Sequence, residues 1–191
     1  MRFQYIYDHS PIFFQNFMTS IYGYTLKHTR YGKYYHEHIQ LLHKLHSYSK
    51  EQLQAYQFEE MIKLLRYVNE HSKFYNELYK NINIDDIKTI EDIKKLPIVT
   101  KEMLRKNIED VITIPKKGAI ADHTGGTTGK SLIVYNRVED IQKRKAVLDF
   151  FKLKNGFENI KMKKATFMGK HIVPPSQKKK VFWRYNKPIK Q

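Results

Sequence analysis

HTGGTTGKS, residues 123–131, is the segment of this chain with the clearest chemical signature. It holds three glycines, three threonines and one lysine within nine positions. Glycines let the backbone turn tightly and bring its N–H groups close to an anion, threonine hydroxyls add compact donors, and lysine adds a full positive charge. The segment therefore predicts a phosphate-binding loop.

The residues on both sides of the loop favour β-structure. Residues 118–121 predict a brief strand, and residues 131–135, Ser-Leu-Ile-Val-Tyr, are rich in the β-branched and aromatic side chains that strands prefer. The loop is therefore expected to join one strand to another.

Two other interpretations of the loop stay open at this point. It comes close to the Walker A pattern G-x-x-x-x-G-K-S/T, but Thr124 stands where that pattern has its first glycine. A Walker A loop also leads directly into a helix, whose N-terminus helps to hold the phosphates, whereas a strand is expected here. A P-loop NTPase is therefore the weaker interpretation. A glycine-rich hairpin that binds nothing is the simplest one.

The first half of the chain is expected to be helical. Residues 50–69 carry an apolar stripe at helical spacing, and Ser49 with Gln52 predicts a capping box at its start. Other predicted elements are a helix from Ser72, short helices at 90–95 and 101–106 capped by Thr89 and Thr100, a helix from Asn136 to about Lys154, and a short strand at 165–168.

Residues 1–35 are dense in aromatic side chains. Phe13, Phe17 and Ile21 share one helical face, which predicts packing against a core, with an interfacial helix on a membrane or a partner as the alternative. Residues 11–26 contain too many polar side chains for a spanning helix, and the N-terminus lacks the features of a signal peptide. We expect no transmembrane segment and a cytoplasmic protein.

The composition excludes several function classes. With 41% hydrophobic residues the chain is too apolar to be disordered, and without cysteine it has no disulfide, no thiolate zinc site and no cysteine nucleophile. The lack of cysteine agrees with a reducing cytoplasm. His36, His38, His43 and His46 follow a helical pattern, but no carboxylate or cysteine is fixed beside them, so we predict no metal site.

The formal net charge of +16 is unevenly distributed. Residues 161–191 hold ten basic side chains and no acidic one. Solvated surface lysines are the simple explanation. A non-enzymatic protein that binds nucleic acid or an anionic glycan, with Trp183 and Tyr185 beside these cations, is the rival from a different class. Nucleic acid is not the partner that we expect.

Thr124–Lys130 resembles the phosphate loop of the adenylate-forming superfamily, S/T-S/G-G-T-T-G-K-P, with Ser131 where proline is usual. In that family the loop connects two strands. FYNELYK at 74–80 and IEDIKKLPIVTKEMLRKN at 90–107 are similar to the phenylacetate-CoA ligase branch. Within this branch, residues 10–35 and 182–188 resemble CapK-type proteins of surface-polysaccharide clusters.

The resemblance implies an α/β fold, in which a helical region at 1–110 leads into the first strands of the large mixed-sheet nucleotide-binding domain at 111–191. It implies ATP and Mg²⁺, activation of a small carboxylate as an acyl-adenylate, and transfer to CoA or an amine. The loop would hold the β- and γ-phosphates by positioning and charge rather than by acid–base chemistry. The residues that carry this role over are Thr124, Gly125, Gly126, Thr127, Thr128, Gly129 and Lys130.

Members of the family are more than twice as long as this chain. Their adenine pocket, their acidic residues for ribose and magnesium, and their C-terminal lysine correspond to positions beyond Gln191. We therefore expect a truncated N-terminal part, incomplete as a domain and inactive alone. A second polypeptide carrying the missing half is a possible partner.

Overall fold

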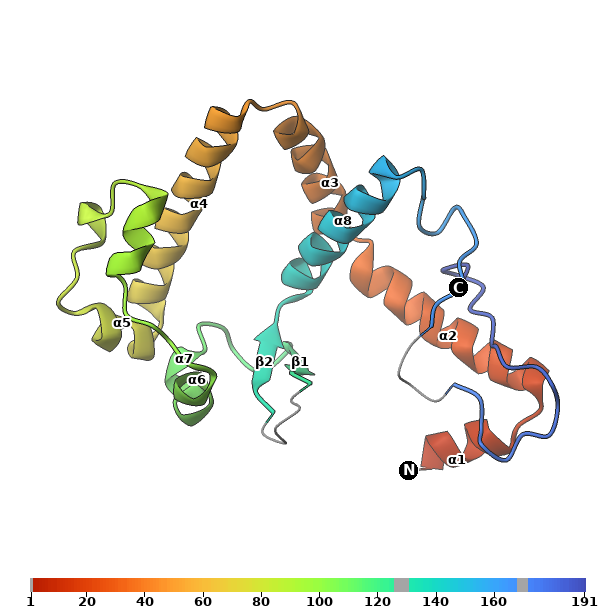
Figure 1. The fold of residues 1–191 in the computed structure, drawn as a ribbon. Coiled ribbons are helices and arrows are strands. Elements are labelled where there is room, and N and C mark those ends of the chain that lie inside the picture. Colours follow the sequence, from red (N-terminus) through yellow and green to blue (C-terminus); the bar gives the residue numbers. More distant parts are fainter. Residues whose placement is uncertain (1, 126–130, 168–171) are drawn as a thin grey trace. The chain divides into compact units, whose positions relative to one another are not determined.

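The computed structural model describes residues 2–125, 131–167 and 172–191, and these are mostly helical with one small antiparallel sheet (Figure 1). Two compact units are present: a terminal unit, residues 1–42 with 139–191, and a central unit, residues 43–138. Both helices and strands occur, as predicted, while the domain boundary at residue 110 stays a prediction.

In chain order the elements are α1 (Arg2–His9), α2 (Ile12–Arg30), α3 (Lys33–His46), α4 (Lys50–His71), α5 (Lys73–Tyr79), the 3₁₀ helices η1 (Ile84–Asp86) and η2 (Ile90–Lys95), α6 (Lys101–Lys106), α7 (Ile108–Val111), β1 (Ile120–His123), β2 (Ile133–Asn136) and α8 (Val138–Lys154).

Helix α4 begins at the predicted capping box. The Ser49 hydroxyl accepts a hydrogen bond from the Gln52 backbone N–H at 3.2 Å, and the Gln52 side chain accepts one from the Ser49 N–H at 2.8 Å. Both bonds satisfy N–H groups that have no partner within the helix. Thr100 caps α6 in the predicted way, accepting from the Met103 N–H at 3.2 Å.

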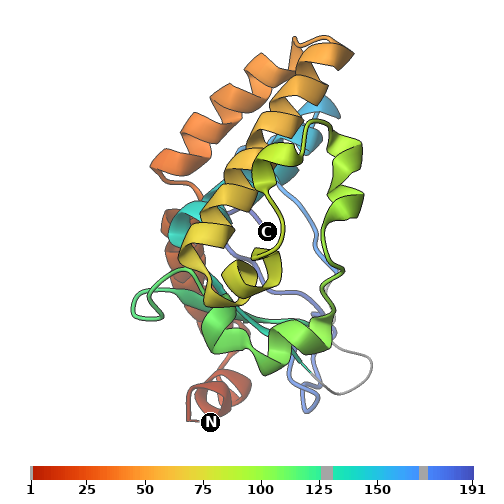
Figure 2. The same cartoon turned by 90° about the vertical axis from the view of Figure 1, so that its left-hand side faces the viewer.

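The apolar core of the central unit lies along α4. Leu65, Tyr79, Ile84 and Ile87 are buried together, and they come from α4, α5 and the η1 segment. The α5, η1 and η2 segments lie beside α4, and Figure 2 shows this arrangement in a view turned by 90° from that of Figure 1. Half-buried side chains complete this core: Phe58, Met61, Ile62, Val68, Tyr75, Leu78, Ile82 and Leu96.

Ser72 joins three helices of the central unit. It is only 1% exposed and stands between α4 and α5. Its hydroxyl accepts from the Tyr75 N–H at 3.3 Å, which caps α5, and donates to the Asp110 carbonyl in α7 at 2.8 Å. One buried hydroxyl thus serves as cap and as tertiary link.

The terminal unit has a strongly polar interior. Gln15, Gln142, Asp149, Arg184 and Asn186 are all buried. Buried polar groups are stable only when they are hydrogen-bonded, so this unit depends on the geometry of its hydrogen bonds more than the central unit does.

The C-terminal segment runs along α2 in the terminal unit (Figure 1). The Arg184 guanidinium donates to the Gln15 side chain, the Tyr185 N–H donates to Asn16 Oδ1 at 2.8 Å, and the Lys187 N–H donates to Ser20 Oγ at 3.2 Å. Gly23 makes room for the Asn186 side chain on this face of the helix.

Asp149 of α8 is the centre of a second buried network. It accepts hydrogen bonds from the side chains of Lys145, Asn159 and Tyr35. Burial, together with the Asp149 charge, raises the pKa of Tyr31 and of Tyr35 above the ordinary tyrosine value. These tyrosines therefore stay neutral and act as donors toward the carboxylate.

Two predictions about packing and secondary structure were wrong. Residues 165–167 form no strand, and Met168, the last residue of the predicted strand, lies outside the described residues; the preceding Lys164 N–H donates to the Lys190 carbonyl at 2.9 Å. Phe13, Phe17 and Ile21 share a face of α2, but this face is exposed because the C-terminal segment packs on the polar side. In the described part of the chain, no helix combines the length and apolarity needed to cross a bilayer.

Candidate phosphate-binding site

The predicted loop lies between the two strands of the sheet. β1 and β2 pair antiparallel in the register Ile120↔Asn136, Ala121↔Tyr135, Asp122↔Val134 and His123↔Ile133. The strand-to-strand arrangement is confirmed, although β1 starts two residues later than predicted. Gly118 has φ +84° and the Ala119 N–H bonds to the Lys116 carbonyl at 3.1 Å, so a turn occupies the positions before Ile120.

Hydrogen bonds close the hairpin at the base of the loop. The Thr124 N–H donates to the Leu132 carbonyl at 3.0 Å, and the Leu132 N–H donates to the Thr124 hydroxyl at 3.0 Å. Ser131 adds a bond from its hydroxyl to the Thr124 carbonyl, also at 3.0 Å. Thr124 thus fixes where the loop leaves the sheet, and its hydroxyl, which accepts one bond, keeps a hydrogen to donate.

The structure describes two of the seven predicted site residues. Thr124 and Gly125 are exposed, and a Cβ on Gly125 would meet no other atom within 4 Å. Gly126, Thr127, Thr128, Gly129 and Lys130 lie outside the described residues. Their role as a phosphate clamp stays a prediction.

The strand after the loop argues against a P-loop NTPase. A Walker A loop needs a helix directly after its lysine and serine or threonine, because the helix N-terminus directs N–H groups and a positive dipole end at the phosphates. Here β2 begins at Ile133, two residues after Ser131, and the next helix, α8, begins only at Val138. The P-loop interpretation was wrong for this reason.

Lys116 is a cation beside the hairpin that no sequence motif indicated. Its Nζ lies 5.5 Å from the centre of the Tyr135 ring and pairs with Glu109 at 2.5 Å. The hydrogen bond to Glu109 raises the pKa of Lys116. Lys116 therefore connects α7 to β2 at the base of the hairpin through contacts on the surface of the protein.

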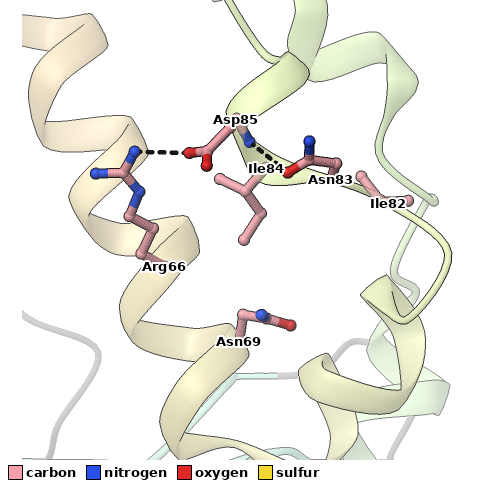
Figure 3. Close-up of a pocket in the computed structure, with 6 residues that line it drawn as sticks. All are labelled: Arg66, Asn69, Ile82, Asn83, Ile84 and Asp85. Atoms are coloured by element: carbon pink, nitrogen blue, oxygen red, sulfur yellow. Dashed lines mark hydrogen bonds and ion pairs between the residues drawn. The ribbon is translucent and has the colours of Figure 1, made fainter.

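A separate pocket of about 270 Å³ lies between α4 and η1 (Figure 3). Arg66 and Asp85 form an ion pair across it at 2.7 Å, and Asn83 accepts from the Asp85 N–H at 3.1 Å. Both charged side chains are more than 60% exposed, so the pair is a weak surface contact. This pocket offers no unpaired cation to a phosphate.

Two cations of the basic C-terminal segment make hydrogen bonds within the protein. Arg184 is only 8% exposed, and its guanidinium donates hydrogen bonds to the side chains of Gln15 and Gln177 and to two backbone carbonyls. Lys190 donates to the Lys161 carbonyl at 2.8 Å. Trp183, which the rival interpretation needs, is 63% exposed.

Four histidines, His36, His38, His43 and His46, lie on α3. Over residues 2–125, 131–167 and 172–191, no group of three or more His, Cys, Asp or Glu side chains is placed to hold a metal ion. Burial, reinforced by the charge of Lys143, lowers the pKa of His38.

A known protein resembles this chain over nearly its whole length. No family model matches the chain. It is 43% identical over 188 residues to the protein CapK of Staphylococcus aureus, an alignment that covers 98% of this chain and 40% of the relative. It is 30% identical over 97 residues to the phenylacetate-coenzyme A ligases of Aromatoleum evansii and Escherichia coli, covering 49% of this chain and 22% of each relative.

The chain belongs to the CapK and phenylacetate-CoA ligase branch of the adenylate-forming superfamily. It spans less than half the length of the curated relatives that it matches. The assignment agrees with the resemblance inferred from the loop and its flanks.

Proposed function

We propose that this chain is the N-terminal part of an ATP-dependent, adenylate-forming ligase of the CapK type. Such a ligase activates a small carboxylate as an acyl-adenylate with release of pyrophosphate, and then transfers the acyl group to CoA or to an amine. The two ligases among the relatives join phenylacetate to coenzyme A by name, which supports this reaction class.

The observation that carries the proposal is the closed hairpin. β1 and β2 hold the two ends of the glycine loop together through Thr124 and Leu132, so the loop is presented as a short, fixed-ended segment. Fixed ends reduce the entropy lost when backbone N–H groups converge on an anion. Residues 124–130 would then hold the β- and γ-phosphates, with Lys130 as a point charge that follows the leaving pyrophosphate.

The residues near the hairpin act by binding and orientation in this proposal. Among the residues that the structure describes, no group of three or more His, Cys, Asp or Glu side chains is placed to hold a metal ion. A link to surface-polysaccharide synthesis, a cytoplasmic location and a second polypeptide that supplies the other half belong to the same proposal.

Inorganic tripolyphosphate is a direct probe of the loop, because it presents the phosphate chain without adenine or ribose. In backbone NMR spectra of the 191-residue protein, we expect tripolyphosphate to shift the amide signals of residues 124–132 most. Lys130→Ala should weaken this binding about tenfold, as expected for loss of one charge-assisted contact. Lys117→Ala, which removes an exposed lysine of the same unit, is the matched control.

Equal weakening by the two variants, or shifts confined to the basic terminal unit, would contradict a phosphate role for the loop. A separate assay addresses the fragment hypothesis. We expect no carboxylate-dependent exchange of pyrophosphate into ATP by the 191-residue chain alone, and measurable exchange would overturn the idea that a second half is required.

A further inference from the structure

The outward face of α2 is an exposed apolar surface. Phe13, Phe17, Ile21 and Tyr24 recur at helical spacing and are 74%, 57%, 52% and 60% exposed. The C-terminal segment contacts α2 through the small or polar residues Asn16, Ser20 and Gly23, which lie along the edge of this face. The large side chains are therefore not the ones that hold this unit together.

The same face carries no charge. Residues 11–26 contain no acidic or basic side chain, and the basic residues Lys27 and Arg30 follow at the C-terminal end of α2. A nucleic acid is bound mainly through cations that contact its phosphates, and this face offers none. It suits a partner with an apolar layer just below a polar surface.

Tyr and Trp side chains prefer the boundary between water and lipid, and Trp, Phe and Leu form the apolar face of helices that lie in it. Tyr5 and Ile6 of α1 are 66% and 53% exposed, and Phe182 and Trp183 of the C-terminal segment are 75% and 63% exposed. All four belong to the terminal unit. This unit therefore presents apolar side chains from three segments.

The charge of the protein is concentrated in the same unit. Residues 1–42 and 139–191 hold 19 lysines and arginines against 6 acidic residues, a net charge of +13. Residues 43–138 hold 16 against 13, a net charge of +3. A surface of anionic lipid attracts such a unit over about one Debye length, and long lysine side chains reach the head groups while their stems cover apolar surface.

We propose that the terminal unit docks peripherally on an anionic phospholipid bilayer, with α2 lying in the plane of the interface and its Phe13–Phe17–Ile21 face inserted below the head groups. Charge brings the unit to the membrane and the aromatic side chains retain it. Amphipathic helices of this kind sink about 5–10 Å into the boundary between head groups and acyl chains, which is within reach of a phenylalanine ring.

Vesicle flotation with the full 191-residue chain tests the proposal. We expect binding to vesicles that contain phosphatidylglycerol, weaker binding to phosphatidylcholine alone, and loss of binding as salt is raised. The double variant Phe13→Ser with Phe17→Ser should weaken binding about tenfold or more. Ile98→Ser removes an even more exposed apolar side chain, 87% exposed, from the central unit and should leave binding unchanged.

Tryptophan fluorescence gives a second readout that does not depend on recovering vesicles. Trp183 is the only tryptophan in the sequence, so a blue shift on adding phosphatidylglycerol vesicles reports on the terminal unit alone. Circular dichroism of the double variant verifies that its helices are intact.

Three results would overturn the proposal. The first is binding of the double variant equal to that of the original protein, which would mean attraction by charge alone. The second is a concentration-dependent dimer that the double variant abolishes, in the absence of vesicle binding, which would assign the face to a second copy. The third is salt-dependent RNA binding lost in the double variant, without vesicle binding.

Discussion

Gly23→Ala tests how the C-terminal segment is seated on α2. In the interior of an isolated helix, alanine stabilises by about 0.5–1 kcal/mol relative to glycine. At this position, however, a Cβ would lie 1.8 Å from Asn186 Oδ1, 2.6 Å from its Cγ and 2.7 Å from its Nδ2. Asn186 is only 6% exposed, so its side chain has little free space into which it can move.

The two effects have opposite signs, and their sizes decide the outcome. Forcing one carbon into a filled site costs about 1–3 kcal/mol, more than the gain in helix propensity, so we expect a net loss of about 1–2 kcal/mol. Asn186→Ala removes all three of the atoms that clash. It also removes Oδ1, a buried acceptor that has no hydrogen-bond partner. In that background, Gly23→Ala should stabilise by about 0.5–1 kcal/mol.

Urea unfolding followed by the fluorescence of Trp183 measures the effect where it occurs, because this tryptophan adjoins Arg184 in the docked segment. The four proteins of the double-mutant cycle give the coupling between the positions, expected at about 2 kcal/mol. A stabilising Gly23→Ala in the original background, or the same effect in both backgrounds, would refute the packing argument.

Three further predictions concern single groups. Ser72→Ala should destabilise by about 2 kcal/mol, since it removes the α5 cap and the buried hydroxyl that donates to the Asp110 carbonyl. Ser49→Ala at the exposed α4 cap should cost about 1 kcal/mol, with both variants measured by urea unfolding followed by circular dichroism. Burial, with the charges of nearby lysines, lowers the pKa of Lys164 to about 8. Above that pH the Lys164 amine is protonated in the unfolded chain but not in the folded protein, so the free energy of unfolding should rise from about pH 8 toward pH 10. Lys164→Met should reduce this rise in denaturation curves measured across that range. Thr124→Val should speed hydrogen exchange of the Leu132 amide, which loses its acceptor, whereas Thr124→Ser should not.

Local signals in the sequence predicted the helices and the hairpin well. Capping at Ser49 and Thr100 joins a side-chain hydroxyl to the backbone N–H three residues later, which is why it could be predicted without knowing the fold. The strand after the glycine loop followed from the β-branched residues near Ile133. The family resemblance had the same local origin, in the loop and its flanking motifs.

Packing partners were harder to predict, and α2 is the clearest example. A stripe of Phe13, Phe17 and Ile21 predicts a buried face, yet these side chains are exposed, and the C-terminal segment bonds to the neighbouring polar residues Asn16 and Ser20. Choosing between these faces depends on hydrogen bonds between residues more than 160 positions apart, such as Tyr185 N–H to Asn16. No local pattern contains that information.

The sequence by itself therefore determined the start of the main helices, the strand–loop–strand arrangement and the family, because each depends on residues that are close together in the chain. Only the tertiary structure decided that Arg184 is buried rather than free, that Asp149 gathers Lys145, Asn159 and Tyr35, and that the aromatic face of α2 is left exposed. These outcomes depend on which polar groups, far apart in the chain, form hydrogen bonds with one another. A buried polar group bonds to the partner that the fold brings within hydrogen-bonding distance.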